Sequence, residues 1–112
     1  MAQKKRAADD PLFATAWVQV FEEDAAGRTV FRPEDADIPL SRRPRERIEL
    51  RDDGSARLWM PGPDDRFYEQ PANWTQQKDE VVLRTDQGTV LRIVDESSRR
   101  LIVEILRAPM QR

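Results

Sequence analysis

The densest group of side chains with binding chemistry is a run of arginines in the middle of the chain. Residues 41–47 carry four arginines within six positions, and Arg66 follows further along. A guanidinium group binds phosphate or carboxylate through two parallel hydrogen bonds, which makes the run a candidate anion site. The alternative is a solvated basic loop whose arginines pair with nearby acids, and the many acids of this chain favour it. The candidate binding residues of this group are Arg42, Arg43, Arg45 and Arg66.

Aromatic side chains form the second candidate group. Trp59 alternates with Leu58 and Met60, so it faces outward or toward a partner if those two face a core. An exposed tryptophan beside arginine is a typical anchor of a protein interface. Tyr68 is the only tyrosine, and we include it with Trp59 as a candidate for ligand or partner binding.

The residue types that most enzymes use are missing. The sequence has no cysteine and no histidine, which removes thiol chemistry and the commonest general base and metal ligand. The acidic pairs 52–53 and 64–65 and the run 22–24 fit turns whose acids bond their own backbone. We therefore expect a non-enzymatic protein with no cofactor and no metal site.

Composition limits the remaining classes of partner. The 112 residues are 36% charged, and 19 Lys and Arg stand against 21 Asp and Glu, for a net charge of -2. Such a balance lacks the positive field of a nucleic-acid-binding domain. No apolar run is long enough for a signal peptide or a membrane span. We expect a cytoplasmic protein that binds neither nucleic acid nor membrane.

The elements that must position these residues are strands. Period-two alternation and β-favouring residues predict them, and turns rich in Gly, Asp and Pro separate them. Pro71 is expected to end a short edge strand, because proline lacks a backbone donor. The irregular segment 34–45 is expected to be held by Ile38 and Leu40. The predicted strands are 15–23, 28–33, 47–51, 56–60, 66–69, 80–85, 89–95 and 101–106.

Short strands at this spacing predict an all-β fold. We expect an antiparallel meander of about seven or eight strands. Closure into a small barrel removes exposed sheet edges and is favoured over a β-sandwich, which remains the alternative. The predicted organisation is a flexible N-terminal tail over 1–11, one barrel domain over 12–107 and a C-terminal tail over 108–112.

Three details resemble the small lipocalin-like (calycin) barrels of bacteria. Trp17 begins the first strand, where lipocalins place the tryptophan of a Gly-x-Trp motif, and Asn73-Trp74-Thr75 is similar to a second such motif. Asp53-Gly54-Ser55 resembles their mid-chain Asp-Gly-Thr hairpin. The resemblance implies that Trp17 and Trp74 fill the barrel ends or line a pocket. Filling is favoured, since eight strands leave little interior space.

Function remains open between two classes. The leading hypothesis is a binding or protein-interaction module that uses the arginine run and Trp59. Its partner would be a protein or a small anionic ligand, and the protein would be a monomer or a weak homodimer. The alternative is a carrier of a small apolar ligand, or a barrel-type isomerase or cyclase, that uses the barrel interior.

Overall fold

The computed structural model describes residues 9–42, 44–61, 66–86 and 88–107 of the 112-residue chain. Nearly all of the two expected tails therefore lies outside the described residues. None of the described residues belongs to a helix long and apolar enough to cross a membrane. The elements are the 3-10 helices η1 (Pro11–Phe13) and η2 (Phe21–Glu23) and the strands β1 (Trp17–Gln19), β2 (Arg28–Pro33), β3 (Arg47–Leu50), β4 (Ser55–Pro61), β5 (Phe67–Gln77), β6 (Glu80–Thr85), β7 (Val90–Glu96) and β8 (Leu101–Arg107).

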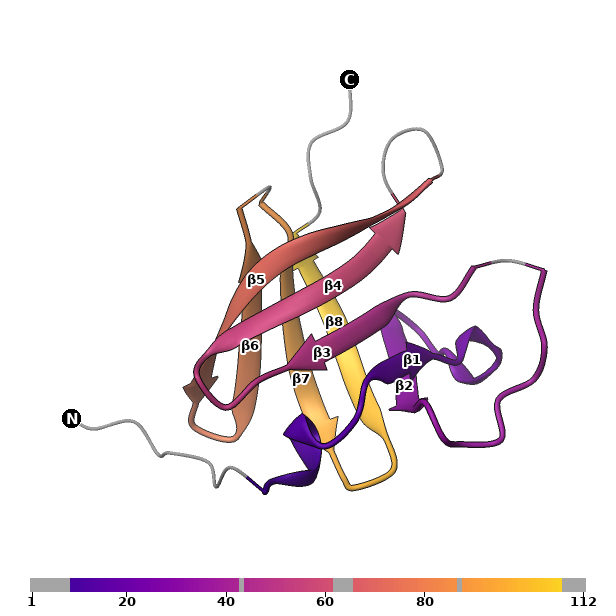
Figure 1. The fold of residues 1–112 in the computed structure, drawn as a ribbon, viewed down its shortest axis with the longest axis horizontal. Helices are drawn as coiled ribbons and strands as arrows, with labels where there is room; N and C mark the ends of the chain where they lie inside the picture. Colours follow the sequence, from indigo (N-terminus) through magenta and orange to yellow (C-terminus); the bar gives the residue numbers. More distant parts are fainter. Residues whose placement is uncertain (1–8, 43, 62–65, 87, 108–112) are drawn as a thin grey trace.

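The eight strands close into an antiparallel barrel (Figure 1), which confirms the expected fold over the sandwich alternative. From β3 to β8 each strand pairs with the next along the chain, as in a meander. The first two strands depart from that order, because β1 pairs with both β2 and β3 while β2 pairs with β8. The chain therefore passes from β2 to β3 through a long connection, residues 34–46.

The first strand is shorter than the sequence predicts. Strand β1 ends at Gln19, and the chain turns into η2 instead of staying extended to residue 23. The physical reason is hydrogen bonding to β2. The backbone N–H of Val20 donates to the carbonyl of Val30, and the Asp24 carboxylate accepts from the N–H of Val30 at 3.1 Å. These two bonds tie the acidic turn directly to β2.

The fifth strand is longer than predicted, because Pro71 does not end it. Strand β5 runs through Pro71, which lies opposite Arg57 on β4. The register with β6 begins one residue later, at Ala72. Pro71 thus sits where β5 pairs on one side only, a position that tolerates a residue without a backbone donor.

Inward-facing side chains fill the barrel. Along β3 they alternate with half-buried side chains, as the period of a pleated strand requires, whereas β1, β2 and β6 also bury residues of the opposite face. These side chains pack together and form the core that occupies the middle of the barrel. The buried cluster consists of Leu12, Trp17, Phe31, Ile48, Leu50, Ala56, Leu58, Met60, Ala72, Val81, Leu83, Leu91, Ile93, Leu101 and Val103.

Helix η1 and two tryptophans cover one end of the barrel, which we call the closed end (Leu12, Phe13, Trp17 and Trp74). Trp17 is fully buried, and its indole Nε1 donates to the carbonyl of Leu12 at 3.0 Å. The rings of Phe13 and Trp74 lie 5.5 Å apart, and Trp74 Nε1 donates to the carbonyl of Arg51 in the β3–β4 turn at 2.6 Å. The structure therefore places both tryptophans as end-filling residues.

Candidate functional site

Arg45, a central member of the arginine run, is bound inside the protein. Its side chain is 11% exposed, and its guanidinium donates to both carboxylate oxygens of Glu22 at 2.9 and 3.0 Å. It also donates to the carbonyls of Gln19 and Pro39 and lies 4.5 Å from the centre of the Phe21 ring. The hydrogen bond to Glu22 raises the pKa of Arg45. Arg45 is therefore the anchor of the connection 34–46.

The rest of that connection differs from the expectation in one respect. Leu40, expected as an anchor, is fully exposed, because Arg45 already fixes the segment through the neighbouring carbonyl of Pro39. Of the other candidate arginines, the structure describes Arg42 and Arg66, which lie on different connections. Arg42 is exposed and forms no ion pair with another described residue. Arg43 lies outside the described residues. Arg66 is exposed just before β5, on a different connection. The structure thus does not assemble the candidate arginines into one described anion site.

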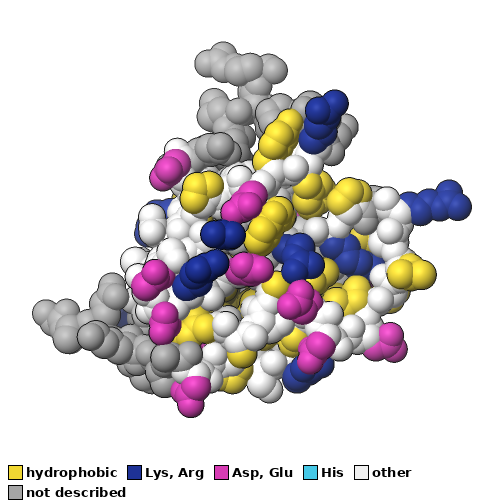
Figure 2. Space-filling model, in the orientation of Figure 1, with side chains coloured by type: hydrophobic (Ala, Val, Ile, Leu, Met, Phe, Trp, Pro, Cys, Tyr) yellow, Lys and Arg dark blue, Asp and Glu magenta, His cyan; other side chains and the backbone are white. Residues whose placement is uncertain are grey.

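Trp59 lies on the outer face of the barrel, as its alternation predicts. In the register it stands between Arg47 on β3 and Glu69 on β5. The Arg47 guanidinium lies 5.9 Å from the Trp59 ring centre and pairs with Glu34 at 3.0 Å. Figure 2 shows acidic and basic side chains interspersed over the face formed by β3, β4 and β5. Trp59 is thus half-buried in a mixed-charge surface.

The end of the barrel opposite η1 carries a different set of inward positions, which we call the barrel mouth. Tyr68 lies opposite Met60 there and is 44% exposed. Ile105 continues the inward face of Leu101 and Val103 but is 48% exposed, so it lies at the rim and not in the core. The mouth residues, taken from six strands or their immediate flanks, are Gln19, Thr29, Glu46, Met60, Tyr68 and Ile105.

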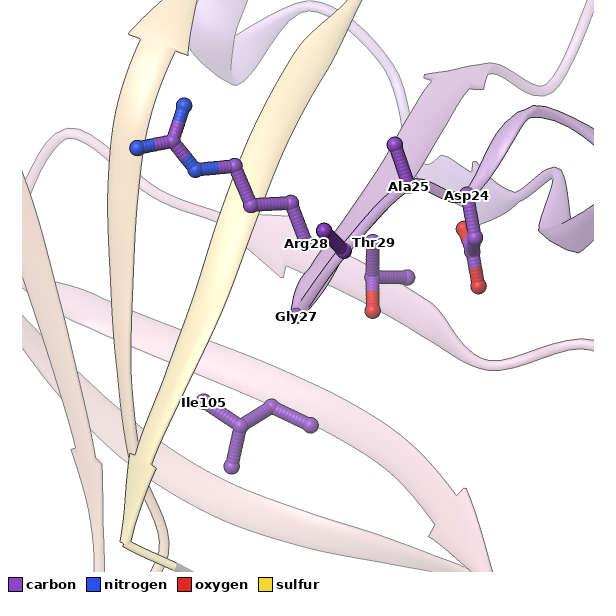
Figure 3. A pocket seen from close by; sticks show the side chains of 7 residues that line it. Asp24, Ala25, Gly27, Arg28, Thr29 and Ile105 are labelled. Atoms are coloured by element: carbon purple, nitrogen blue, oxygen red, sulfur yellow. The ribbon is translucent and has the colours of Figure 1, made fainter.

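An open hollow of about 440 Å³ borders this mouth between the β1–β2 turn and the end of β8. Its walls include Asp24, Thr29 and Ile105. Figure 3 shows Arg28 crossing β8 to one side, whereas Ile105 projects to the other side, where Thr29 and Asp24 lie. Arg28 pairs with Glu104 at 3.0 Å on the outer face. Because Arg28 also lines the hollow, it presents acidic, basic, hydroxyl and apolar groups.

Glu46 is the one acid of this region whose pKa rises strongly. Its backbone is fixed to Gln19 by two hydrogen bonds, of 2.8 and 3.1 Å. Its partly buried side chain has no hydrogen bond or ion pair with another described residue. Burial, together with the negative charge of Asp24, raises the pKa of Glu46 to about 7. A carboxyl group that titrates near neutral pH at a barrel opening is a candidate functional group.

The paired acid Glu104 shows the opposite behaviour. Its carboxylate accepts from Arg92 at 2.6 Å and from Arg28 at 3.0 Å on the outer face. These hydrogen bonds lower the pKa of Glu104 below its usual range. Arg28 and Arg92 are thus directed to an acid of the outer face, whereas Glu46 has no ion pair with another described residue.

Gln70 supplies a second unpaired group near the mouth. It lies opposite Leu58, one inward step from Tyr68, and is only 6% exposed. Its buried Oε1 atom has no hydrogen-bond partner. An amide oxygen left in this state costs roughly 1–3 kcal/mol relative to a bonded one. Such a group indicates either local strain or a place for a missing hydrogen-bond donor.

Sequence reasoning did not select Glu46 or Gln70, although a signal for Glu46 was present. Glu46 precedes Ile48 by two residues, so period two places it on the inward face of the same strand. Gln70 was not selected because Pro71 was expected to end the strand.

Within the described residues, no group of three or more acids, cysteines or histidines could hold a metal ion. The mouth is thus a candidate site with polar side chains.

The comparisons with known proteins found no matching family model, no matching curated protein and no matching solved structure. The fold and the geometry of the barrel mouth are therefore the features that bear on function.

Proposed function

We propose that this protein is a non-enzymatic, lipocalin-like binding module that holds a small ligand at the barrel mouth. The observation that carries the proposal is that the barrel holds two polar groups without partners among the described residues, the buried amide oxygen of Gln70 and the carboxyl of Glu46. A ligand that donates hydrogen bonds there would recover the desolvation cost of both groups. The cytoplasm remains the proposed compartment, for which the cysteine-free composition is suitable.

The mouth is a better candidate than the deep interior. Leu50, Leu58, Leu83, Ile93 and Val103 all belong to the packed core, and the closed end is filled by Trp17. The described hollow beside the mouth has a volume in the range of small-ligand pockets. We therefore propose that the ligand binds at the rim, and that the packed interior supports this site without binding the ligand itself.

Nuclear magnetic resonance with a library of small polar fragments tests this proposal. Binders are expected to shift the backbone amide signals of Thr29, Glu46, Gln70 and Ile105 together. The variant Gln70→Leu should weaken these binders, since it keeps the size of the side chain and removes its polar atoms. Gln77→Leu, at an exposed position of the same strand, is the matched control. Binders that shift only signals of the closed end would refute the proposal.

A second candidate function is protein interaction through the connection 34–46. It is favoured by the full exposure of Leu40 on a segment that Arg45 holds in place. An exposed leucine on a fixed loop can enter a partner's pocket at low entropic cost. A photo-crosslinking residue at position 40 should capture a partner, whereas the same residue at position 77 should not. Loss of capture in Arg42→Ala would assign the neighbouring arginine to the same contact.

A further inference from the structure

We propose that the outer wall of the barrel carries a second binding site, a groove over β4 and β5 that takes a sugar acid. The carboxylate of this ligand faces Arg51 and Arg57, and its hydroxyl groups face Asn73 and Asp86. The groove lies on the wall of the barrel, so it is separate from the barrel mouth of the proposed function.

The groove is an open hollow of about 320 Å³, within the size range of small-ligand pockets. The β3–β4 turn, β4, β5 and the turn after β6 all contribute to it. Pro71 adds an exposed apolar ring to its lining. The polar and charged lining residues are Arg51, Ser55, Arg57, Asn73 and Asp86.

The register of β4 and β5 brings the floor of the groove together. Ser55 lies directly opposite Asn73, and Arg57 lies directly opposite Pro71. Residues opposite each other in an antiparallel sheet have Cβ atoms roughly 4.5–5.5 Å apart. The alanines between them on each strand belong to the buried core, so these four side chains point to the outer face.

The two sides of the groove carry opposite charges. On the β4 side lie Arg57 and Arg51, and the backbone N–H of Arg51 donates to the carbonyl of Ser55 at 2.9 Å. On the β6 side lies Asp86, which follows Thr85, the last residue of β6 that pairs with β5. A ligand that crosses the groove therefore meets a cationic side and an acidic side.

The charged groups of the groove are available to a ligand. Arg51, Asn73 and Asp86 are exposed, and their side chains form no hydrogen bond or ion pair with another described residue. Arg57 pairs with Glu69 at 3.3 Å, and both side chains are 47% exposed. Exposed pairs of this kind are weak, so a ligand carboxylate can compete for the Arg57 guanidinium.

The Asp53 carboxylate of the β3–β4 turn is bonded to Ser55. It accepts from the Ser55 hydroxyl at 2.6 Å and from the Ser55 N–H at 2.9 Å. These hydrogen bonds lower the pKa of Asp53, and the charge of Arg51 lowers it further. Because the Ser55 hydroxyl donates its proton to Asp53, its lone pairs remain to accept from a ligand hydroxyl.

A sugar acid matches this arrangement. A guanidinium group binds a carboxylate through two parallel hydrogen bonds. The Asp86 carboxylate accepts from hydroxyl groups, and the Asn73 amide both donates and accepts. The negative charge of Asp86 also favours a singly charged carboxylate over a doubly charged phosphate.

Nuclear magnetic resonance titrations of the full chain at pH 7 and low salt test the inference. The four probes are D-glucuronate, D-glucose, cyclohexanecarboxylate and D-glucose 6-phosphate. D-glucuronate should shift the backbone amide signals of Ser55, Arg57, Asn73 and Asp86 together. Its dissociation constant should be roughly tenfold lower than that of each other probe.

Two variants and a matched control locate the binding. Arg57→Gln should raise the dissociation constant of D-glucuronate roughly tenfold. Asp86→Asn should remove the preference for D-glucuronate over D-glucose 6-phosphate. The control Arg100→Gln changes an arginine of the same exposure, 47%, which pairs with Asp95 at 4.0 Å in the β7–β8 hairpin. It should leave the affinity unchanged.

Each contrary result overturns a stated part of the inference. Equal binding of D-glucuronate and D-glucose would refute the role of the arginines, and equal binding of cyclohexanecarboxylate would refute the role of the hydroxyl groups. Tighter binding of D-glucose 6-phosphate, an unchanged affinity in Arg57→Gln, or no binding of any probe would also overturn it. Shifts confined to Thr29, Glu46 and Ile105 would overturn it and support the barrel mouth instead, so the two proposals fail separately.

Discussion

The indole Nε1 of Trp17 donates a hydrogen bond of 3.0 Å to the backbone carbonyl of Leu12, and this bond fastens η1 across the closed end of the barrel. Both residues are buried, so the bond satisfies two polar groups that have no access to water. The contact joins a 3-10 helix of three residues to the first strand and holds this helix over the closed end of the barrel.

Removal of the Trp17 donor should destabilise the fold. The variant Trp17→Phe leaves the Leu12 carbonyl buried without its partner and removes part of a fully buried ring. We expect a loss of about 2–4 kcal/mol of unfolding free energy in urea titrations. Trp59→Phe, which changes a half-buried ring on the outer face, should cost less than about 1 kcal/mol. Equal losses in the two variants would contradict the role given to Trp17.

Substitution of Arg45 should loosen the connection 34–46. Lysine cannot reproduce the fork that reaches Glu22 and the carbonyls of Gln19 and Pro39 at once. We expect Arg45→Lys to raise the rate of trypsin cleavage after Arg42 by roughly tenfold, because the segment opens more often. The control Arg57→Lys affects an exposed pair with Glu69 and should leave that rate unchanged. An unchanged rate in Arg45→Lys would show that other contacts hold the segment.

Glu46 should make stability depend on pH near neutrality. Its pKa rises to about 7 in the fold from a usual value of 4.5, so the folded state holds a proton that the unfolded state has lost. The contribution to stability is therefore fully present below pH 4.5 and disappears as the pH rises through 7. Its full size is at most about 3 kcal/mol.

The variant Glu46→Gln isolates this contribution. The difference in unfolding free energy between the variant and the wild type should grow in favour of the variant from pH 4.5 to pH 8. The acids with lowered pKa values, such as Glu104 and Asp53, titrate in both proteins and cancel in this difference. A difference that stays constant over that interval would refute the raised pKa.

Gly54 should be sensitive to substitution for a backbone reason alone. Its φ is +93°, and a Cβ atom built at this position would meet no atom within 4 Å. Gly54→Ala should therefore cost about 1–2 kcal/mol through the positive φ. Gly54→Asn should cost less, since asparagine tolerates this region better than alanine. Thermal unfolding of the two variants measures both effects, and equal costs would point to side-chain contacts instead.

Much of the secondary structure could be predicted because it is local. Strands 28–33 and 80–85 were predicted with the observed bounds, and the hairpin of β3 and β4 follows from alternation around Gly54. The two errors of length, in β1 and β5, have non-local causes. Hydrogen bonds to Val30 end the first strand, and the missing β6 partner allows Pro71 in the fifth.

The candidate site could be predicted much less well. The arginine run could be recognised in the sequence. The sequence did not show that Arg45 binds a residue of its own chain, since its partner Glu22 lies 23 positions earlier. Glu46 looked like one acid among many. Only the fold places its carboxyl in a partly buried position close to the charge of Asp24, and this position raises its pKa.

The sequence by itself determined an all-β chain, because the period of two and the turn residues act over a few positions. It also determined which side chains alternate inward, and therefore most of the core. The tertiary structure decided the order of strands, with β1 between β2 and β3, because pairing depends on contacts between distant segments. It likewise decided which charges are neutralised, since ion pairs form between residues that only the closed barrel brings together.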